Sequence, residues 1–534
     1  MSTANLSNAV ENWLLNYRDL LETKSQASYH GPKISVNDTA GKLAFVYEKI
    51  RNTVDYREDH LLRRHATARI LKRIANPGHK GSDIARPLIE ELIRARYLAN
   101  DSLPEHQVDH VAHLINKYIV IYNVIVDSSY PPKEMKNFFD WLLTIAACEV
   151  EETLVPSDEE KILVEVTERT IKQNLVFDGH CQLDEEGKNI QVYVAILKSL
   201  LKADEMTVNY FLLKYYFSDW HDLTLPEAEH IAHDVKRTQA VIKDNFYHPL
   251  NEKLGRDFKK YIAVFWILQD IVQKNPDQYL NIFARKEKLI EKVEETCRTM
   301  YSHIGAKVRR AIIRSVIYIF CTKIIFGIVL EFPFDYYILK ELRWLPLAIN
   351  AIFPPLLMAA IGASIRTPGK ANTAEIVKEV ESIVYHDSPA SELRVRLMKP
   401  KKGFLNILLN FLYFVMYVIS FGLIVYGLDK LNFSVASILI FLLFLTMVSF
   451  FSLRIRRTAA ELIILKQRER FLTVIVSFLF VPILRVGRWI AMHSSKINVF
   501  IFILDFIIEA PFKVFVRIFE DLVIFVKEKR DEML

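Results

Sequence analysis

Residues 311–331 read AIIRSVIYIFCTKIIFGIVLE, and this stretch decides what kind of fold the chain can have. Its length matches the roughly 20 residues that an α-helix needs to cross about 30 Å of hydrocarbon. A backbone inside lipid must pair its own polar groups, which a helix does along its whole length. The stretch therefore predicts a helix that spans a membrane.

Three more apolar runs follow, at about 345–365, 404–427 and 433–453. Each reaches or approaches the length of a span. Residues 1–300 differ, because charged residues occur throughout them and their apolar residues recur at helical spacing. We therefore expect an all-α chain with a multi-helix N-terminal domain followed by about four transmembrane helices.

Periodicity and turn residues also predict the individual N-terminal helices, while two-residue alternation is too rare for a substantial sheet. The expected helices lie at about 39–75, 83–99, 105–126, 133–152, 157–175, 189–202, 205–218, 225–246 and 251–272. A charged stretch over 275–300 precedes the first span. The expected parts of the chain are a helical domain (1–300), a basic junction with spans one and two (301–365), a basic linker (366–403), spans three and four (404–453) and a C-terminal part (454–534).

The basic residues of the loops predict the orientation. Lysines and arginines are dense before the first span, in the loop 366–403 and in the loop 454–470, whereas the opposite connections are short. The positive-inside rule then places these segments and the N-terminal domain in the cytosol. Residues 1–30 lack the apolar core of a signal peptide, which agrees with a cytosolic N-terminal domain. Scarce glycine with abundant Ile, Lys and Phe suggests an AT-rich genome, so we expect the inner (cell) membrane of a bacterium.

The C-terminal part has shorter apolar segments. Phe471 to Leu484 is followed by Arg485 and Arg488, and Val499 to Ile508 is interrupted by Asp505. Runs of about 10–14 residues are usually too short to span. We expect a re-entrant or interfacial hairpin, with two further spans as the alternative. The last helix, about 511–530, has an apolar face and a charged face and is expected to lie in the interface.

Lys323 lies near the middle of the first predicted span. A lone ammonium at the bilayer centre costs about 2.5–3.5 kcal/mol, so it normally faces protein or water and has a partner. The acids in apolar context are Glu331, Asp505 and Glu509. We predict an intramembrane cluster of Lys323 with Asp505 and Glu509. Such a cluster would serve as a charge relay or as a structural ion pair that docks the C-terminal hairpin onto the first span. Alternatively, Lys323 snorkels to an interface and no cluster forms.

Pro354 and Pro355 fall inside the second predicted span, with Asn350 upstream. Proline removes a helical hydrogen bond and favours a kink. Transporters use broken helices as ion sites, although a kink that only improves packing is commoner.

Histidines in the N-terminal domain are candidates for a metal site. His106, His110 and His113 would lie on one helix face, and Glu227 with His230 forms an ExxH pattern near His233. A di-iron bundle needs a second such motif, which the chain lacks. Helical histidines at or near the surface are the alternative, and we expect no cofactor.

Charge clusters suggest possible partners. The stretch 57–80 is strongly basic, and its outer face would suit anionic lipid headgroups or remain solvated. It has no interleaved aromatic residues for base stacking, so we expect no nucleic acid. The acidic stretch from Glu149 to Glu160 would pair with a basic partner or with this same basic face.

No catalytic motif identifies an enzyme. The Walker A, HExxH and GxSxG patterns and paired CxxC motifs are absent. The favoured hypothesis is a membrane-anchored helical adaptor or scaffold whose cytosolic domain binds a protein partner. The alternatives are a transporter or channel-like protein that uses Lys323, Asp505 and Glu509, and a metal-binding helical domain tethered to the membrane. The sequence does not indicate an oligomeric state.

Overall fold

The computed structural model describes residues 6–26, 31–36, 48, 59–126, 130–179, 183–341, 343–386, 393–396, 404–465 and 471–496. Most of these residues are helical, as expected. Within them, the sheet consists of two short paired strands, β1 (Leu175–Asp178) and β2 (Leu393–Arg396). The chain forms two compact units, which we call the N-terminal unit (described residues within 8–175 and 183–258) and the C-terminal unit (described residues within 6–7, 176–179 and 259–496).

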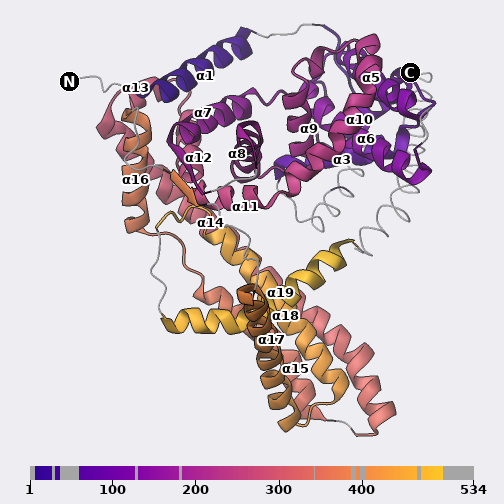
Figure 1. Cartoon of the computed structure of the whole chain (residues 1–534), viewed down its shortest axis with the longest axis vertical. Coiled ribbons are helices and arrows are strands. Elements are labelled where there is room, and N and C mark those ends of the chain that lie inside the picture. The colour runs from indigo at the N-terminus through magenta and orange to yellow at the C-terminus, as the bar shows by residue number, and fades with distance from the viewer. Residues whose placement is uncertain are drawn as a thin grey trace, which may run out of the picture. The chain divides into compact units, whose positions relative to one another are not determined.

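The N-terminal unit is a set of packed helices (Figure 1). Its core is built as the sequence pattern requires, since Ile84, Leu88 and Leu92 recur at helical spacing and are almost fully buried. Its elements are α1 (Asn8–Gln26), α3 (Asp59–Ile74), α4 (Gly81–Arg94), α5 (Gln107–Val126), α6 (Pro132–Leu154), α7 (Asp158–Asn174), α8 (Glu185–Leu200), α9 (Glu205–Tyr216), the short 3₁₀ helix η1 (Trp220–Asp222), α10 (Leu225–Tyr247) and α11 (Pro249–Asp257).

The C-terminal unit begins with helices that carry charges and continues into the apolar ones. Its elements are α12 (Lys259–Lys274), α13 (Tyr279–Phe283), α14 (Lys286–Phe326), the π-helical η2 (Gly327–Glu331) and η3 (Phe334–Leu339), α15 (Trp344–Ser364), α16 (Lys370–Tyr385), α17 (Phe404–Lys430), α18 (Val435–Ala459) and α19 (Phe471–Lys496).

Within the described residues, four helical stretches are long and apolar enough to cross a membrane: Lys286–Ile338, Trp344–Ser364, Ile407–Lys430 and Val435–Ala459. Much of their apolar surface faces outward, as Ile317, Phe411 and Leu423 show with 58%, 63% and 73% exposure. Exposed apolar patches of this extent are rare on soluble proteins and mark surfaces that lipid or a partner covers. The length, apolar character and exposure of these four stretches are consistent with a membrane protein.

The apolar helices pack as a bundle. Helix α18 contacts α14, α15 and α19, and α17 contacts α19 (Figure 1). Ile319, Met358, Phe444 and Val448 form a buried apolar cluster where α14, α15 and α18 meet. At one end of the bundle, the Arg343 guanidinium donates a hydrogen bond to the Asn432 carbonyl at 3.0 Å, which joins the two short connections.

At the other end, the buried amide of Asn372 in α16 connects several segments. Its Nδ2 donates to the Tyr301 hydroxyl at 2.9 Å and to the Leu462 carbonyl at 2.7 Å. Its Oδ1 accepts from the Ile464 backbone N–H at 2.9 Å. One side chain therefore holds α14, α16 and the segment after α18 together.

Three element boundaries differ from those expected. The predicted helix 251–272 is two helices, because α11 ends before Phe258 and α12 begins at Lys259. Helix α14 runs unbroken from the charged stretch into the first span. Helix α19 continues through Arg485 and Arg488, where the pattern predicted an interruption. The predicted helix start at 39, the second arm of the hairpin (499–508) and the interfacial helix (511–530) lie outside the described residues.

Candidate functional site

The most unusual polar group in the apolar bundle is Lys323, in the last turn of α14. It is 1% exposed, and its Nζ lies 2.5 Å from Oε1 of Glu331, which is also 1% exposed. The ammonium also lies 4.8 Å from the centre of the Phe444 ring, a cation–π distance. The pair satisfies the need of a buried charge for a partner.

The π-helical turn η2 explains why residues eight apart meet. A regular α-helix has 3.6 residues per turn and returns to the same face after about seven residues. The wider π-helical turn delays this return, so Glu331 comes around to the side of Lys323. The spacing of an α-helix does not predict that Glu331 pairs with Lys323. Glu331 is nevertheless one of the acids in an apolar context in the sequence.

Asn350 of α15 completes the contacts of the pair. Its Nδ2 donates to Oε1 of Glu331 at 2.6 Å and to the Ser437 carbonyl at 3.1 Å. Asn350 is fully buried, and the two bonds join the first span to α15 and α18. Pro354 and Pro355 are buried further along α15, which remains one helix through both of them.

Asp335 in η3 is the group that the sequence analysis missed. It is 1% exposed, and neither of its carboxylate oxygens has a hydrogen-bond partner among the described residues. The Oδ1 of Asn350 likewise lacks a partner there. One buried ammonium thus accompanies two buried carboxyl groups. Asp335 lies in an apolar run, four residues after Glu331, and that context was its only signal in the sequence.

The structure does not test the two predicted partners of Lys323. Asp505 and Glu509 lie outside the described residues, so their contribution to the cluster stays a prediction. Within the described part of the chain, Lys323 pairs with Glu331 of its own helical stretch.

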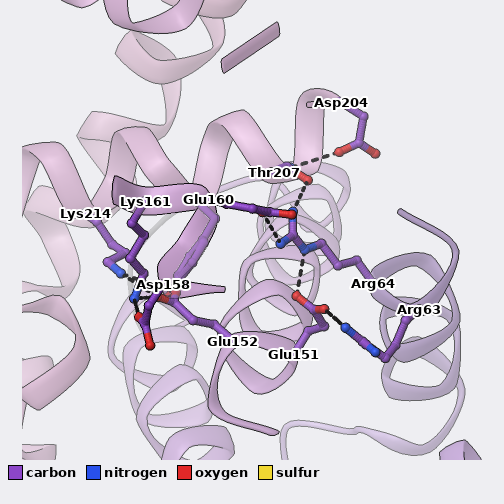
Figure 2. A network of polar contacts seen from close by, with 11 residues as sticks. Arg63, Arg64, Glu151, Glu152, Asp158, Glu160, Lys161, Asp204, Thr207 and Lys214 are labelled. Atoms are coloured by element: carbon purple, nitrogen blue, oxygen red, sulfur yellow. Dashed lines mark hydrogen bonds and ion pairs between the residues drawn. The ribbon is translucent and has the colours of Figure 1, made fainter. Parts of the chain in front are cut away.

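A second buried polar network lies in the N-terminal unit, around three glutamates of α6. Glu151 accepts from two arginines of α3: its Oε1 lies 2.5 Å from Nη2 of Arg63, and its Oε2 lies 2.8 Å from Nε of Arg64 (Figure 2). The acidic stretch therefore pairs with the basic stretch of the same chain, which was one of the two alternatives. Arg69 and Arg73 also pair with acids, Glu48 and Glu91.

Glu152 has its own set of partners. Lys161 Nζ lies 2.5 Å from its Oε1, and the Tyr210 hydroxyl donates to its Oε2 at 2.5 Å. Burial alone would raise the pKa of Glu152, but hydrogen bonds from Lys161 and Tyr210 and the charge of Lys214 outweigh it and lower the pKa to about 2. Figure 2 shows the lysines converging on this carboxylate.

Glu149 is the most buried of the three. Lys117 Nζ lies 2.7 Å from its Oε1, and the Tyr118 hydroxyl and the Trp220 indole N–H donate to its Oε2. Burial raises the pKa of Glu149, but His221, Lys117 and Tyr118 lower it overall. Each of the three glutamates is occupied by two or more donors, so the network holds helices together and leaves none of these carboxylates poised as a general base.

The neighbouring thiol is also unsuited to chemistry. Cys148 is buried, and burial raises the pKa of its thiol well above the usual range despite the charge of Arg64. A thiol that stays protonated at neutral pH is a poor nucleophile.

The histidine candidates for a metal site are exposed: His106, His110, His113, His230 and His233. Glu227 caps α10, because its carboxylate accepts from the backbone N–H and the hydroxyl of Thr224 at 2.8 and 2.7 Å. Throughout the described ranges, no three His, Cys, Asp or Glu side chains come together so that they could hold a metal ion. The geometry adds nothing to the metal hypothesis.

No family model, curated protein or solved structure matches this chain. The features that bear on function are therefore the polar cluster of the bundle and the buried network of the N-terminal unit.

Proposed function

We propose that the chain is a membrane-anchored helical adaptor, whose N-terminal unit binds a protein partner and whose C-terminal unit holds it at the membrane. The membrane would be the bacterial cell membrane, with the N-terminal unit in the cytosol as the basic loops indicate. The C-terminal hairpin and interfacial helix would add to the anchor.

The observation that carries this proposal is the closed packing of Lys323 against Glu331. Both side chains are 1% exposed, and Asn350 joins them to two neighbouring helices. An ammonium group that is held by a buried carboxylate of the same bundle is better suited to stabilise helix packing than to conduct an ion. The N-terminal unit supports the same conclusion, because its buried glutamates are occupied by structural partners.

The test uses the full chain in lipid nanodiscs, incubated with extract of the source cells in mild salt. We expect a protein to be recovered that empty nanodiscs do not retain. Hydrogen exchange of the recovered complex should protect amides in the N-terminal unit. Recovery of no protein above the empty nanodiscs, or protection confined to the C-terminal unit, would contradict the adaptor.

A second candidate function, transport of a proton or small cation, is favoured by one observation. Asp335 is a buried carboxyl without a hydrogen-bond partner among the described residues, and Oδ1 of Asn350 likewise lacks a partner there. Ionisable residues inside membranes often mark ion pathways. Asp505 and Glu509 would extend such a pathway, as the sequence suggested.

Liposome flux measurements test this second function. Asp335→Asn keeps the shape of the side chain but removes the ionisable proton. Transport requires that the wild type shows flux and that the variant loses it while its melting temperature stays unchanged. Absence of flux in the wild type, or equal flux in the variant, would exclude a transport role for Asp335.

A further inference from the structure

An open groove of about 880 Å³ runs between α14 and α15 at the end of the bundle where α16 lies. Its wall is apolar over most of its length and is formed by Val308, Ile312, Ile313, Val316, Ile317, Ala359, Gly362, Ala363 and Ile365. Apart from Gly305, its remaining lining has polar side chains: Tyr301, Ser302, Arg309, Arg366 and Thr367. The volume is within the range of about 300–1,000 Å³ that is typical of ligand sites.

The two arginines lie at the same end of the groove because the helices are antiparallel. A Cβ added to Gly362 would lie 2.6 Å from Cγ2 of Ile312, and one added to Gly305 would lie 3.3 Å from Cγ2 of Thr367. The part of α14 from Gly305 to Ile312 thus faces the end of α15 and the residues that follow it, which brings Arg309 and Arg366 to one rim. The apolar wall extends from that rim toward the centre of the spans.

Neither arginine is neutralised within the described residues. Arg309 and Arg366 are exposed, and neither forms an ion pair or side-chain hydrogen bond within the described residues. This contrasts with Arg63 and Arg64, which share one carboxylate. Within the described part of the chain, the rim therefore combines two guanidinium groups that have no ion-pair partner with Ser302, which is also exposed.

We propose that this groove binds an anionic phospholipid. The anionic phosphate of the headgroup would accept hydrogen bonds from Arg309 and Arg366, and one acyl chain would lie along the apolar wall. Charge complementarity selects the occupant, since guanidinium groups bind phosphate oxygens in a bidentate manner and the wall below them offers no polar partner. The site is independent of the adaptor role, because it needs only the membrane helices.

The test titrates the purified full chain in neutral detergent with phosphatidylglycerol or phosphatidylcholine and measures bound lipid by native mass spectrometry. We expect phosphatidylglycerol to bind more tightly. Arg309→Gln and Arg366→Gln should each weaken it about fivefold. The double variant should bind more weakly than either single variant, without strict additivity, because both arginines share one headgroup. The matched control is Arg310→Gln, which removes the same charge from an exposed neighbour outside the groove lining. Equal binding of the two lipids, or an equal effect of Arg310→Gln, would overturn the site.

Three further measurements identify the occupant. Ala363→Phe should block the apolar wall and weaken phosphatidylglycerol binding, whereas Ala360→Phe, at another exposed position of α15 that does not line the groove, should not. Glycerol 3-phosphate should fail to displace the lipid, since it lacks acyl chains, and displacement would indicate a site for a free phosphate ester instead. A photo-crosslinker at Val316 should capture lipid, and a crosslink to residues 499–534 of the chain itself would assign the groove to that segment.

Discussion

At the scale of single residues, Lys323 and Glu331 place opposite charges in the interior of an apolar bundle. Removing one member of a buried ion pair leaves the other charge uncompensated, which typically costs about 3–5 kcal/mol. Replacing both by apolar groups of similar volume is often close to neutral.

We therefore expect Lys323→Met alone, or Glu331→Leu alone, to lower the melting temperature of the full chain in detergent strongly. The double variant should recover most of the loss, because it leaves no unpaired charge. Scanning fluorimetry on the three variants measures this directly. If the double variant melts as low as the single ones, the pair contributes through shape or through other partners rather than through charge compensation.

Glu152 gives a pH-dependent prediction in the N-terminal unit. Its pKa of about 2 in the folded chain lies below the ordinary value of 4.5, so its contribution is present above pH 4.5 and is lost as the pH falls from 4.5 toward 2. The full contribution is up to about 3 kcal/mol.

Glu152→Gln should thus lower the melting temperature clearly at pH 7. The difference from the wild type should shrink as the pH falls below 4.5. The exposed Glu229→Gln is a suitable control and should change little at either pH. A difference that stays constant from pH 7 to pH 3 would mean that the charge of Glu152 does not stabilise the fold.

At the scale of elements, the packing of α18 on α19 depends on a glycine. A Cβ added to Gly487 would lie 2.1 Å from the carbonyl oxygen of Thr446, a backbone atom that cannot move without shifting the helix. On Gly422 of α17, an added Cβ would meet nothing within 4 Å.

We expect Gly487→Ala to destabilise the bundle by about 1–3 kcal/mol, as overpacking does. Gly422→Ala should leave stability unchanged or raise it slightly, because alanine favours a helix. The melting temperatures of both variants in the same detergent test this. Equal behaviour of the two would show that α19 does not pack closely on α18.

The sequence predicted elements well where one local property dominates. Apolar length located the four candidate spans, and helical spacing located α4 to α10 within a few residues. It failed where the chain changes helix type or direction without a strong local signal. Gly255 in the last turn of α11 is a weak signal for the break at Phe258, because isolated glycines also occur inside helices. The π-helical turns after Phe326 have no spacing pattern that predicts them.

At the scale of the whole molecule, the charge bias of the loops predicts the topology. Lys378 of α16 and Lys430 at the end of α17 are both exposed and flank the third span. They should therefore lie on opposite sides of the membrane.

The experiment places a single cysteine at each position in a chain whose four cysteines are replaced by serine. An impermeant maleimide added to intact cells should label Lys430→Cys, while Lys378→Cys should react only after the membrane is permeabilised. Labelling of both positions from the same side would exclude a third span, and the reverse pattern would invert the orientation.

The sequence by itself determined that the chain is helical, that part of it has the length and apolar character of membrane spans, and that Lys323 needs a partner. These properties follow from local backbone hydrogen bonding and from the thickness of the bilayer. Only the tertiary structure decided which partners meet. A π-helical turn brings Glu331 to Lys323, and helix packing leaves Asp335 unpaired within the described residues and sets three glutamates of α6 against lysines and arginines. The glutamate pairings depend on contacts between residues far apart in sequence, and the Lys323–Glu331 pair depends on a local change of helix type; α-helical spacing patterns specify neither.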